Sequence, residues 1–215
     1  MGNSYEPKIR QIISLAEHLP YFRLDHLAGI ENDKNYLKTL FFRYKKAGKL
    51  VSLKKGMYVT KEYIDTIQKS GVFPSYIEFI SGILYEPSYL SLDYVLYQHN
   101  VLTEIPVNFT LISKKKTARF SNRFGIFFYH KMKSNLFCGF EILHKGDFTI
   151  YKATKAKALF DFLYLRKNAI FDRSSAKALR LNLEAFDASD KKEFMGYIKI
   201  EGSKKMAEIF KYLFL

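Results

Sequence analysis

The residues best suited to chemistry lie on the polar face of a helix predicted to begin just after Asp33. An asparagine amide bonds adenine through two hydrogen bonds, arginine does the same for guanine, and lysine suits phosphate as well as bases. We assign base recognition to Asn35, Lys38 and Thr39, near the start of the helix, and phosphate contacts to the later cations. The full set of candidate DNA contacts is Lys34, Asn35, Lys38, Thr39, Arg43, Lys46, Lys54 and Lys55.

The opposite face of this helix is apolar and needs a core to cover it. Apolar side chains recur at i, i+3, i+4 and i+7, the spacing of one helical face, at Leu37, Leu40, Phe41 and Tyr44. Asp33 is suited to cap the start of the helix, and Gly48 follows its last periodic residue. Phe42 is an exception because it falls on the polar face, where we expect it to pack on the following hairpin or on a second domain.

The surrounding elements predict how this helix is presented. Residues 50–53 and 57–59 have strand patterns and flank a Lys-Lys-Gly turn, and two further helices are predicted earlier, over residues 7–19 and 22–28. Three helices and a basic hairpin within about 60 residues are typical of a winged helix-turn-helix. We therefore predict a DNA-binding domain over residues 1–70. The alternative is a charged helix face that is only solvated, as most such faces are.

Composition agrees with a polyanionic partner. The chain has 215 residues, 48% of them hydrophobic, and 35 Lys and Arg against 21 Asp and Glu, a net charge of +14. Such a charge balance favours nucleic acid or an acidic membrane surface as a partner, although a merely basic soluble protein would also account for it.

The single cysteine, Cys138, allows no intrachain disulfide. No membrane-length apolar segment and no targeting sequence is apparent, so we expect a cytoplasmic protein.

Residues 71–215 are predicted to form a second, mixed α/β domain. A helix capped by Ser75, an extended segment over 87–90 and a short helix capped by Ser91 come first. Period-two patterns over 107–113, 125–129, 137–143 and 148–151 predict an antiparallel sheet, and helices over 154–166, 174–185, 189–200 and 203–214 complete the chain. The predicted class is α+β. A basic loop between the first two of these strands is a possible second nucleic-acid contact, with Lys114, Lys115, Lys116, Arg119 and Arg123; an exposed polar hairpin tip is the alternative.

Three aromatic-rich segments in this second part have a distinctive order and spacing. They are Pro87–His99, Phe124–His130 and Ala153–Tyr164. Together, behind a basic winged helix, they resemble the AbiEi family of antitoxins from bacterial type IV toxin–antitoxin systems, over roughly residues 7 to 170. The chain departs from the family in two places: Asn100 stands where Gly is common, and Lys155-Ala156 replaces the usual acidic approach to the third segment.

The resemblance implies an antitoxin that represses its own operon. The winged domain would bind inverted repeats in promoter DNA, and the second domain would counteract a nucleotidyltransferase-like toxin without needing a stable complex with it. The motifs that carry the resemblance consist of core and capping residues, so we assign them no catalytic role. No cofactor and no metal are expected.

Other classes of function have less support in the sequence. A nucleotidyltransferase needs Gly-Ser followed closely by paired carboxylates, but Gly202-Ser203 precedes lysines, and Glu31 and Asp33 suit a turn and a cap. His130, Cys138 and His144 match no compact zinc motif. A winged regulator with a ligand-sensing second domain remains an alternative, and so does an RNA-binding protein that stacks bases on its aromatic-rich sheet.

Overall fold

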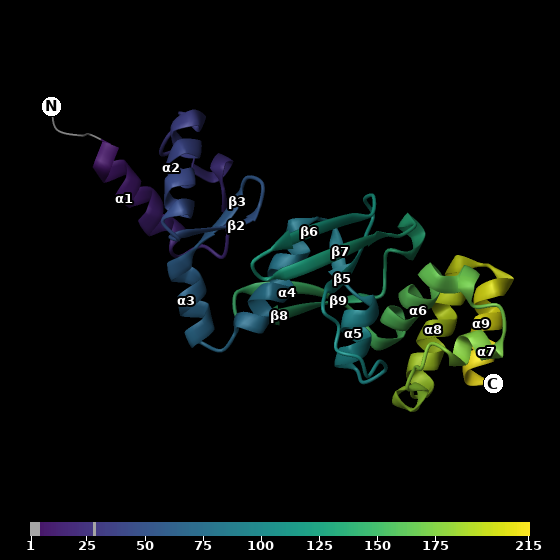
Figure 1. Ribbon diagram of the computed structural model, residues 1–215. Coiled ribbons are helices and arrows are strands. Elements are labelled where there is room, and N and C mark those ends of the chain that lie inside the picture. The colour runs from purple at the N-terminus through teal and green to yellow at the C-terminus, as the bar shows by residue number, and fades with distance from the viewer. Residues whose placement is uncertain (1–4, 28) are drawn as a thin grey trace. The chain divides into compact units, whose positions relative to one another are not determined.

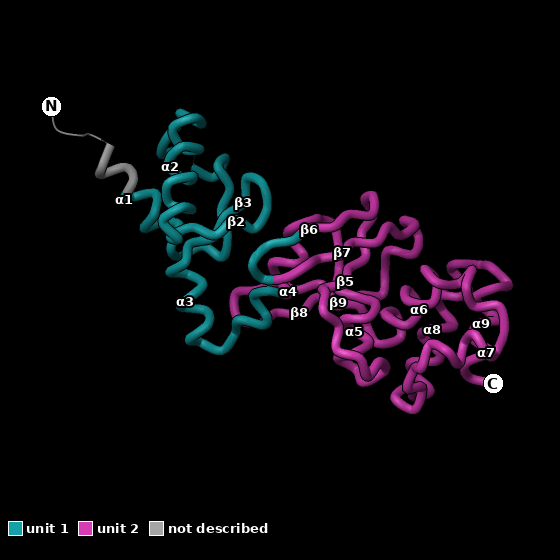
Figure 2. The backbone as a smooth tube through the Cα atoms, viewed as in Figure 1, with its two compact units in different colours: residues 1–77, 121–124 teal, residues 78–120, 125–215 magenta. Residues whose placement is uncertain are grey.

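The computed structural model describes residues 5–27 and 29–215 and is of the α+β class, as expected. The chain divides into two compact units, residues Met1–Ile77 with Ser121–Phe124, and residues Glu78–Phe120 with Gly125–Leu215 (Figure 2). The predicted boundary near residue 70 coincides with the end of a helix, whereas the units divide a few residues later, inside the next helix.

The first unit alternates short helices with a small sheet (Figure 1). Its elements are α1 (Tyr5–Ala16), β1 (Phe22–Arg23), the 3₁₀ helix η1 (Leu24–Leu27), α2 (Lys34–Lys46), β2 (Leu50–Lys54), β3 (Met57–Thr60) and α3 (Lys61–Lys69). Within the described residues, the strands form an antiparallel sheet in the order β1-β3-β2. The expected second α-helix over 22–28 is wrong, because Phe22 and Arg23 pair with β3 and a single 3₁₀ turn follows. Ala28, where that helix was to end, lies outside the described residues.

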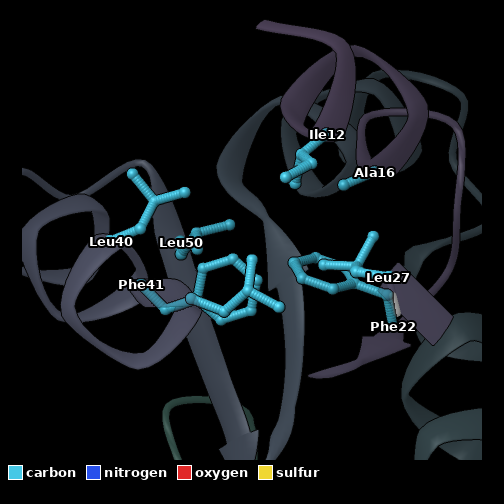
Figure 3. Close-up of a cluster of buried hydrophobic side chains, with 8 residues drawn as sticks. Ile12, Ala16, Phe22, Leu27, Leu40, Phe41 and Leu50 are labelled. Carbon is cyan, nitrogen blue, oxygen red and sulfur yellow. The ribbon is translucent and has the colours of Figure 1, made fainter. Parts of the chain in front are cut away.

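The core of the first unit joins every one of its early elements. Phe22, Phe41 and Tyr58 form a cluster of rings with centroids 5.1–6.1 Å apart, in which Phe22 and Phe41 meet edge to face. Figure 3 shows the side chains from α1, β1, η1, α2 and β2 gathered around the same point. The apolar face of α2 predicted from its spacing is confirmed, because Leu37, Leu40 and Phe41 are buried. The position of α2 is therefore fixed by its inner face.

The second unit is built on a larger, mixed sheet. Helix α4 (Phe73–Leu84) leads into it, and its strands are β4 (Ser88–Leu90), β5 (Phe109–Ser113), β6 (Ala118–Asn122), β7 (Gly125–Lys131), β8 (Phe140–Lys145) and β9 (Phe148–Ala153). Among the described residues the order is β6-β7-β5-β4-β9-β8. The helices are α5 (Leu92–Gln98), α6 (Lys155–Arg166), α7 (Arg173–Lys177), α8 (Ala188–Glu201) and α9 (Lys204–Phe214), with 3₁₀ turns at Ser134–Leu136, Lys167–Ala169 and Leu183–Ala185.

Several predictions for this unit need correction. The sheet is mixed and not antiparallel, because β5 runs parallel to β7 and β4 runs parallel to β9. Alternating patterns predict strands but do not determine which strands pair. The segment 118–122, expected within a basic loop, is strand β6. Helix α4 begins at Phe73, so Ser75 lies in its first turn and does not cap it. The helix expected over 174–185 ends at Lys177.

Helix α6 is the buried centre of the second unit. Thr154 caps it, as predicted, by accepting a hydrogen bond from the Lys157 backbone N–H at 3.1 Å. Every residue from Ala156 to Leu163 is buried, as expected of a helix covered on nearly all sides. Two of these buried residues, Lys157 and Asp161, are charged and lie one turn apart.

These two side chains form an ion pair that reaches into other elements. Lys157 Nζ lies 2.7 Å from Asp161 Oδ1 and donates to the Leu136 carbonyl, while Tyr89 and Ser91 donate their hydroxyls to Asp161 Oδ2. Burial raises the pKa of the Asp161 carboxyl, an effect opposed by the ammonium and the two hydroxyls. Burial, with the charge of Asp161, also raises the pKa of the Tyr89 phenol, which keeps it a donor. The network joins β4 and the start of α5 to α6.

We predict that Asp161→Asn destabilises the second unit strongly. The variant leaves the Lys157 ammonium buried without a counter-charge, and loss of one partner of a buried pair costs about 3–5 kcal/mol. Lys61 and Asp65 provide a matched control, because they form an i,i+4 Lys–Asp pair on α3 that is exposed to solvent. Asp65→Asn should cost about 0.5 kcal/mol or less. Urea unfolding of the full chain measures both; equal midpoints for the two variants would contradict the structural role of the buried pair.

Candidate nucleic-acid interface

The outer face of α2 is a continuous row of exposed side chains. Asp33 holds the start of the helix, as predicted, because its carboxylate accepts hydrogen bonds from the backbone N–H groups of Asn35 and Tyr36 at 2.9 and 3.0 Å. Glu31 in turn accepts from the Asp33 N–H, which occupies both carboxylates of that segment in capping. The exposed row, at i, i+3, i+4, i+7, i+8 and i+11, is Asn35, Lys38, Thr39, Phe42, Arg43 and Lys46.

Within the described part of the first unit, the cations of this row have no counter-charges. Among the described residues, Lys38, Arg43 and Lys46 form no ion pair or hydrogen bond through their side chains, and α2 contains no acidic residue. Lys34 differs, because its Nζ lies 3.6 Å from the Asp25 carboxylate, with both side chains largely exposed. Such an exposed pair contributes little and is readily exchanged for another anion. The row therefore has unneutralised positive charge on a rigid element.

Asn35 and Thr39, near the start of α2, differ in the hydrogen-bonding groups that remain free on their side chains. No partner of the Asn35 side-chain amide is found in the described part of the chain, so its donor and acceptor are both open to a base edge. Thr39 donates its hydroxyl proton to the Asn35 carbonyl at 3.0 Å. Its oxygen can still accept a hydrogen bond, and its methyl group can make an apolar contact. Toward a base edge, the Thr39 hydroxyl can therefore act as a hydrogen-bond acceptor but not as a donor.

The hairpin after α2 ends in the basic turn that was predicted. β2 and β3 pair antiparallel, with an irregularity between Ser52 and Lys54, and Gly56 takes a φ of +78°, a conformation that favours glycine. Lys55 is exposed and Lys54 is partly exposed. Both line a groove of about 280 Å³ together with Asp25 and Gly56.

Arg123 joins this hairpin from a distant part of the sequence. The turn 121–124 belongs to the first unit, where the Asn122 side chain donates to the Leu53 carbonyl at 3.0 Å and Phe124 packs against Phe73 and Tyr76. The turn and the hairpin enclose a groove of about 580 Å³. Its lining contains four cations and no acidic residue: Lys45, Lys54, Lys55 and Arg123. Lys45 was missed in the sequence, because its place beside the hairpin follows only from the fold.

The other four cations of the predicted second nucleic-acid contact lie in the second unit. Lys114, Lys115 and Lys116 are exposed in the connection between β5 and β6, and Arg119 is on β6, all in the second unit. Three of the four lie over aromatic rings, at 5.0 Å for Lys114 and Phe137, 5.3 Å for Lys115 and Tyr85, and 5.5 Å for Arg119 and Phe128. The five predicted cations are therefore divided between two units and do not form one loop.

The described part of the second unit contains a small apolar pocket and no candidate metal site. No group of three His, Cys, Asp or Glu residues arranged for a metal ion occurs in the described ranges. His130 on β7 and His144 on β8 are separated by four strand spacings, roughly 19 Å.

An apolar pocket of about 250 Å³ is lined by Phe79, Ile83, Phe137, Phe140 and Tyr151, with Glu86, Ser88 and Thr149 as its polar groups. On the sheet, Phe127 and Tyr129 are fully buried, so these rings are core and cannot stack on bases.

Comparisons with family models and curated proteins assign no family to this chain, so the proposed function rests on the arrangement of side chains described above. The chain matches no known family model, and no curated protein matches it either. No helix in the described residues is long and apolar enough to cross a membrane.

We predict that the hairpin cations determine part of the salt dependence of binding to duplex DNA. Lys54→Gln with Lys55→Gln should reduce the slope of log K against log salt by roughly 0.9 for each phosphate contact removed. Fluorescence anisotropy at several salt concentrations measures that slope. Lys177→Gln with Lys199→Gln, which removes two exposed charges of the second unit, is the control and should leave the slope unchanged. An unaltered slope in the hairpin variant would exclude the hairpin from the interface.

Proposed function

We propose that this chain is a DNA-binding regulator that contacts duplex DNA through α2 and the β2–β3 hairpin. The observation that carries the proposal is the row of cations on α2, which has no counter-charges within the described residues and lies on a helix without acidic residues. The groove lined by Lys45, Lys54, Lys55 and Arg123 adds a second anion-binding surface in the same unit. Phosphate neutralisation supplies most of the affinity of such interfaces.

The order of elements in the first unit supports a winged helix. A helix, a short strand, a helical turn, a second full helix and a two-stranded hairpin follow one another, and the strands form one sheet. In a winged helix the helix before the hairpin enters the major groove and the hairpin contacts the backbone. α2 has 13 residues and is about 20 Å long, enough to extend across a groove about 12 Å wide.

We extend the proposal to an AbiEi-like antitoxin that represses its own promoter and counteracts a nucleotidyltransferase-like toxin. Support comes from the segments that carry the resemblance. Tyr89 and Ser91 of the first segment bind Asp161 of the third, and Tyr129 of the second donates to the Ser81 carbonyl at 2.6 Å in the same unit. Asn100, which stands where the family commonly has Gly, has a φ of +57°. Gly and Asn are the residues that adopt this region most readily, so the departure retains the backbone shape.

The pocket between α4 and the sheet favours a second candidate, a regulator that senses a small apolar ligand. Its six aromatic and aliphatic side chains, Pro87 included, and its few polar groups resemble the lining of ligand sites. Its volume of about 250 Å³ is below the usual range of roughly 300–1,000 Å³. This candidate keeps the same DNA interface and differs only in what the second unit does.

We predict that Lys38→Glu, Arg43→Glu and Lys46→Glu together abolish binding to the DNA upstream of this coding sequence. Three repulsive charges would replace three phosphate or base contacts, a change of at least about 100-fold in affinity at moderate salt. The melting temperature should change little, because all three side chains are exposed and none has a partner in the described residues. Fluorescence anisotropy with a labelled duplex and thermal unfolding measure the two effects.

The matched control reverses the same number of charges elsewhere. Lys177→Glu, Lys192→Glu and Lys199→Glu change exposed residues of the second unit and give the same net charge. This control should bind nearly as tightly as the original chain. Equal losses in both variants would mean that only the overall charge matters, and retained binding by the α2 variant would contradict the proposed interface.

The antitoxin part is tested by growth. If the neighbouring reading frame encodes a nucleotidyltransferase-like protein, its expression should arrest growth, and co-expression of this chain should relieve the arrest. The α2 charge-reversal variant should relieve it equally, because the activity is assigned to the second unit. Continued arrest with a well-folded chain, or no such neighbouring frame, would remove the antitoxin part and leave the DNA-binding part standing.

A further inference from the structure

The centre of the basic face of α2 is occupied by an aromatic ring. Phe42 is 68% exposed, whereas Leu37, Leu40 and Phe41 on the inner face are 1%, 6% and 1% exposed. Phe42 was expected to pack on the following hairpin or on the second domain; packing on the hairpin is wrong, since most of the side chain is exposed. Phe42 therefore makes little contribution to the core, and its apolar surface is available for a partner.

The surroundings of Phe42 indicate the kind of partner. One helical turn before it is Lys38 and one turn after it is Lys46, with Arg43 beside it, and none of these cations has an ion-pair partner among the described residues. A protein surface that covered the ring would have to bury or neutralise these charges as well, at a cost in desolvation. A polyanion that presents an apolar group between its phosphates satisfies the ring and the cations together.

Duplex DNA has one such group on the base edges of its major groove, the 5-methyl of thymine. We propose that Phe42 recognises a thymine methyl and is a specificity-determining residue of the interface. This inference rests on the proposed DNA-binding function and adds the identity of a base.

Thr39 extends the same apolar contact. Its hydroxyl proton is donated to the Asn35 carbonyl at 3.0 Å, so toward DNA it offers a methyl group and an acceptor. Thr39 and Phe42 are at i and i+3, which places them on the same side of the helix. Three residues of helix rise about 4.5 Å, against about 3.4 Å for one base-pair step. The two side chains therefore reach the same or neighbouring base pairs, and the preferred site contains thymine there.

The test removes the methyl group from the DNA and the ring from the protein. A duplex is first selected by the full-length chain from a random library, and each thymine in it is then replaced singly by deoxyuridine, which lacks only the 5-methyl. We expect at least one replacement to weaken binding about fourfold, the factor for burial of one methyl-sized group. Phe42→Ala should lose most of this discrimination, with a small remainder from the Thr39 methyl, and Phe42→Leu should retain a larger part of it.

The outcomes separate this inference from the proposed function. If a duplex is selected and bound but no deoxyuridine replacement weakens binding, or if Phe42→Ala discriminates as strongly as the original chain, the role of Phe42 is overturned while DNA binding stands. If no duplex is enriched, the proposed function itself fails. If Phe42→Ala leaves DNA binding unaltered but converts a dimer to a monomer in light scattering, the ring contacts a second copy, and the inference is overturned. Unchanged melting of Phe42→Ala is the folding control.

Discussion

Lys157 and Asp161 lie one turn apart on a helix that is buried on nearly every side, and the second unit is arranged to satisfy them. Their side chains are fully buried, and the carboxylate also accepts the hydroxyls of Tyr89 and Ser91, which lie 72 and 70 residues away in the sequence. A charge removed from water needs such partners. The ion pair therefore restricts how β4, α5 and α6 can pack, and the aromatic rings of Tyr89, Phe160 and Tyr197 surround the ammonium within 6.0 Å.

The first unit uses charge in the opposite way. Its core is apolar and aromatic, and the cations of α2 are held outward on a helix whose inner face is fixed by that core. Exposed charges of one sign on a rigid face contribute nothing to folding and raise the local positive potential. Buried, paired charge thus specifies structure in the second unit, while exposed, unpaired charge is available for recognition in the first.

Local features were predictable from the sequence and long-range ones were not. The Asp33 cap, the apolar face of α2, the Lys-Lys-Gly turn and the Thr154 cap depend on residues within a few positions of one another. Ser91 was predicted to cap α5, but its hydroxyl binds Asp161, and no side-chain cap bond forms. Lys157 looked like an ordinary helix residue, because a lysine gives no local signal of burial. Likewise, the place of Arg123 beside the hairpin depends on a contact between Asn122 and Leu53 that no periodicity encodes.

We propose that this chain contacts DNA through α2 and the hairpin. A titration of the isotopically labelled full-length chain with its upstream duplex, followed by backbone amide NMR, addresses it residue by residue. We expect the largest changes in chemical shift from Asn35 to Lys46 and at Lys54 and Lys55, with the amides of α6 unaffected. Changes confined to the second unit, or none at saturating DNA, would contradict it.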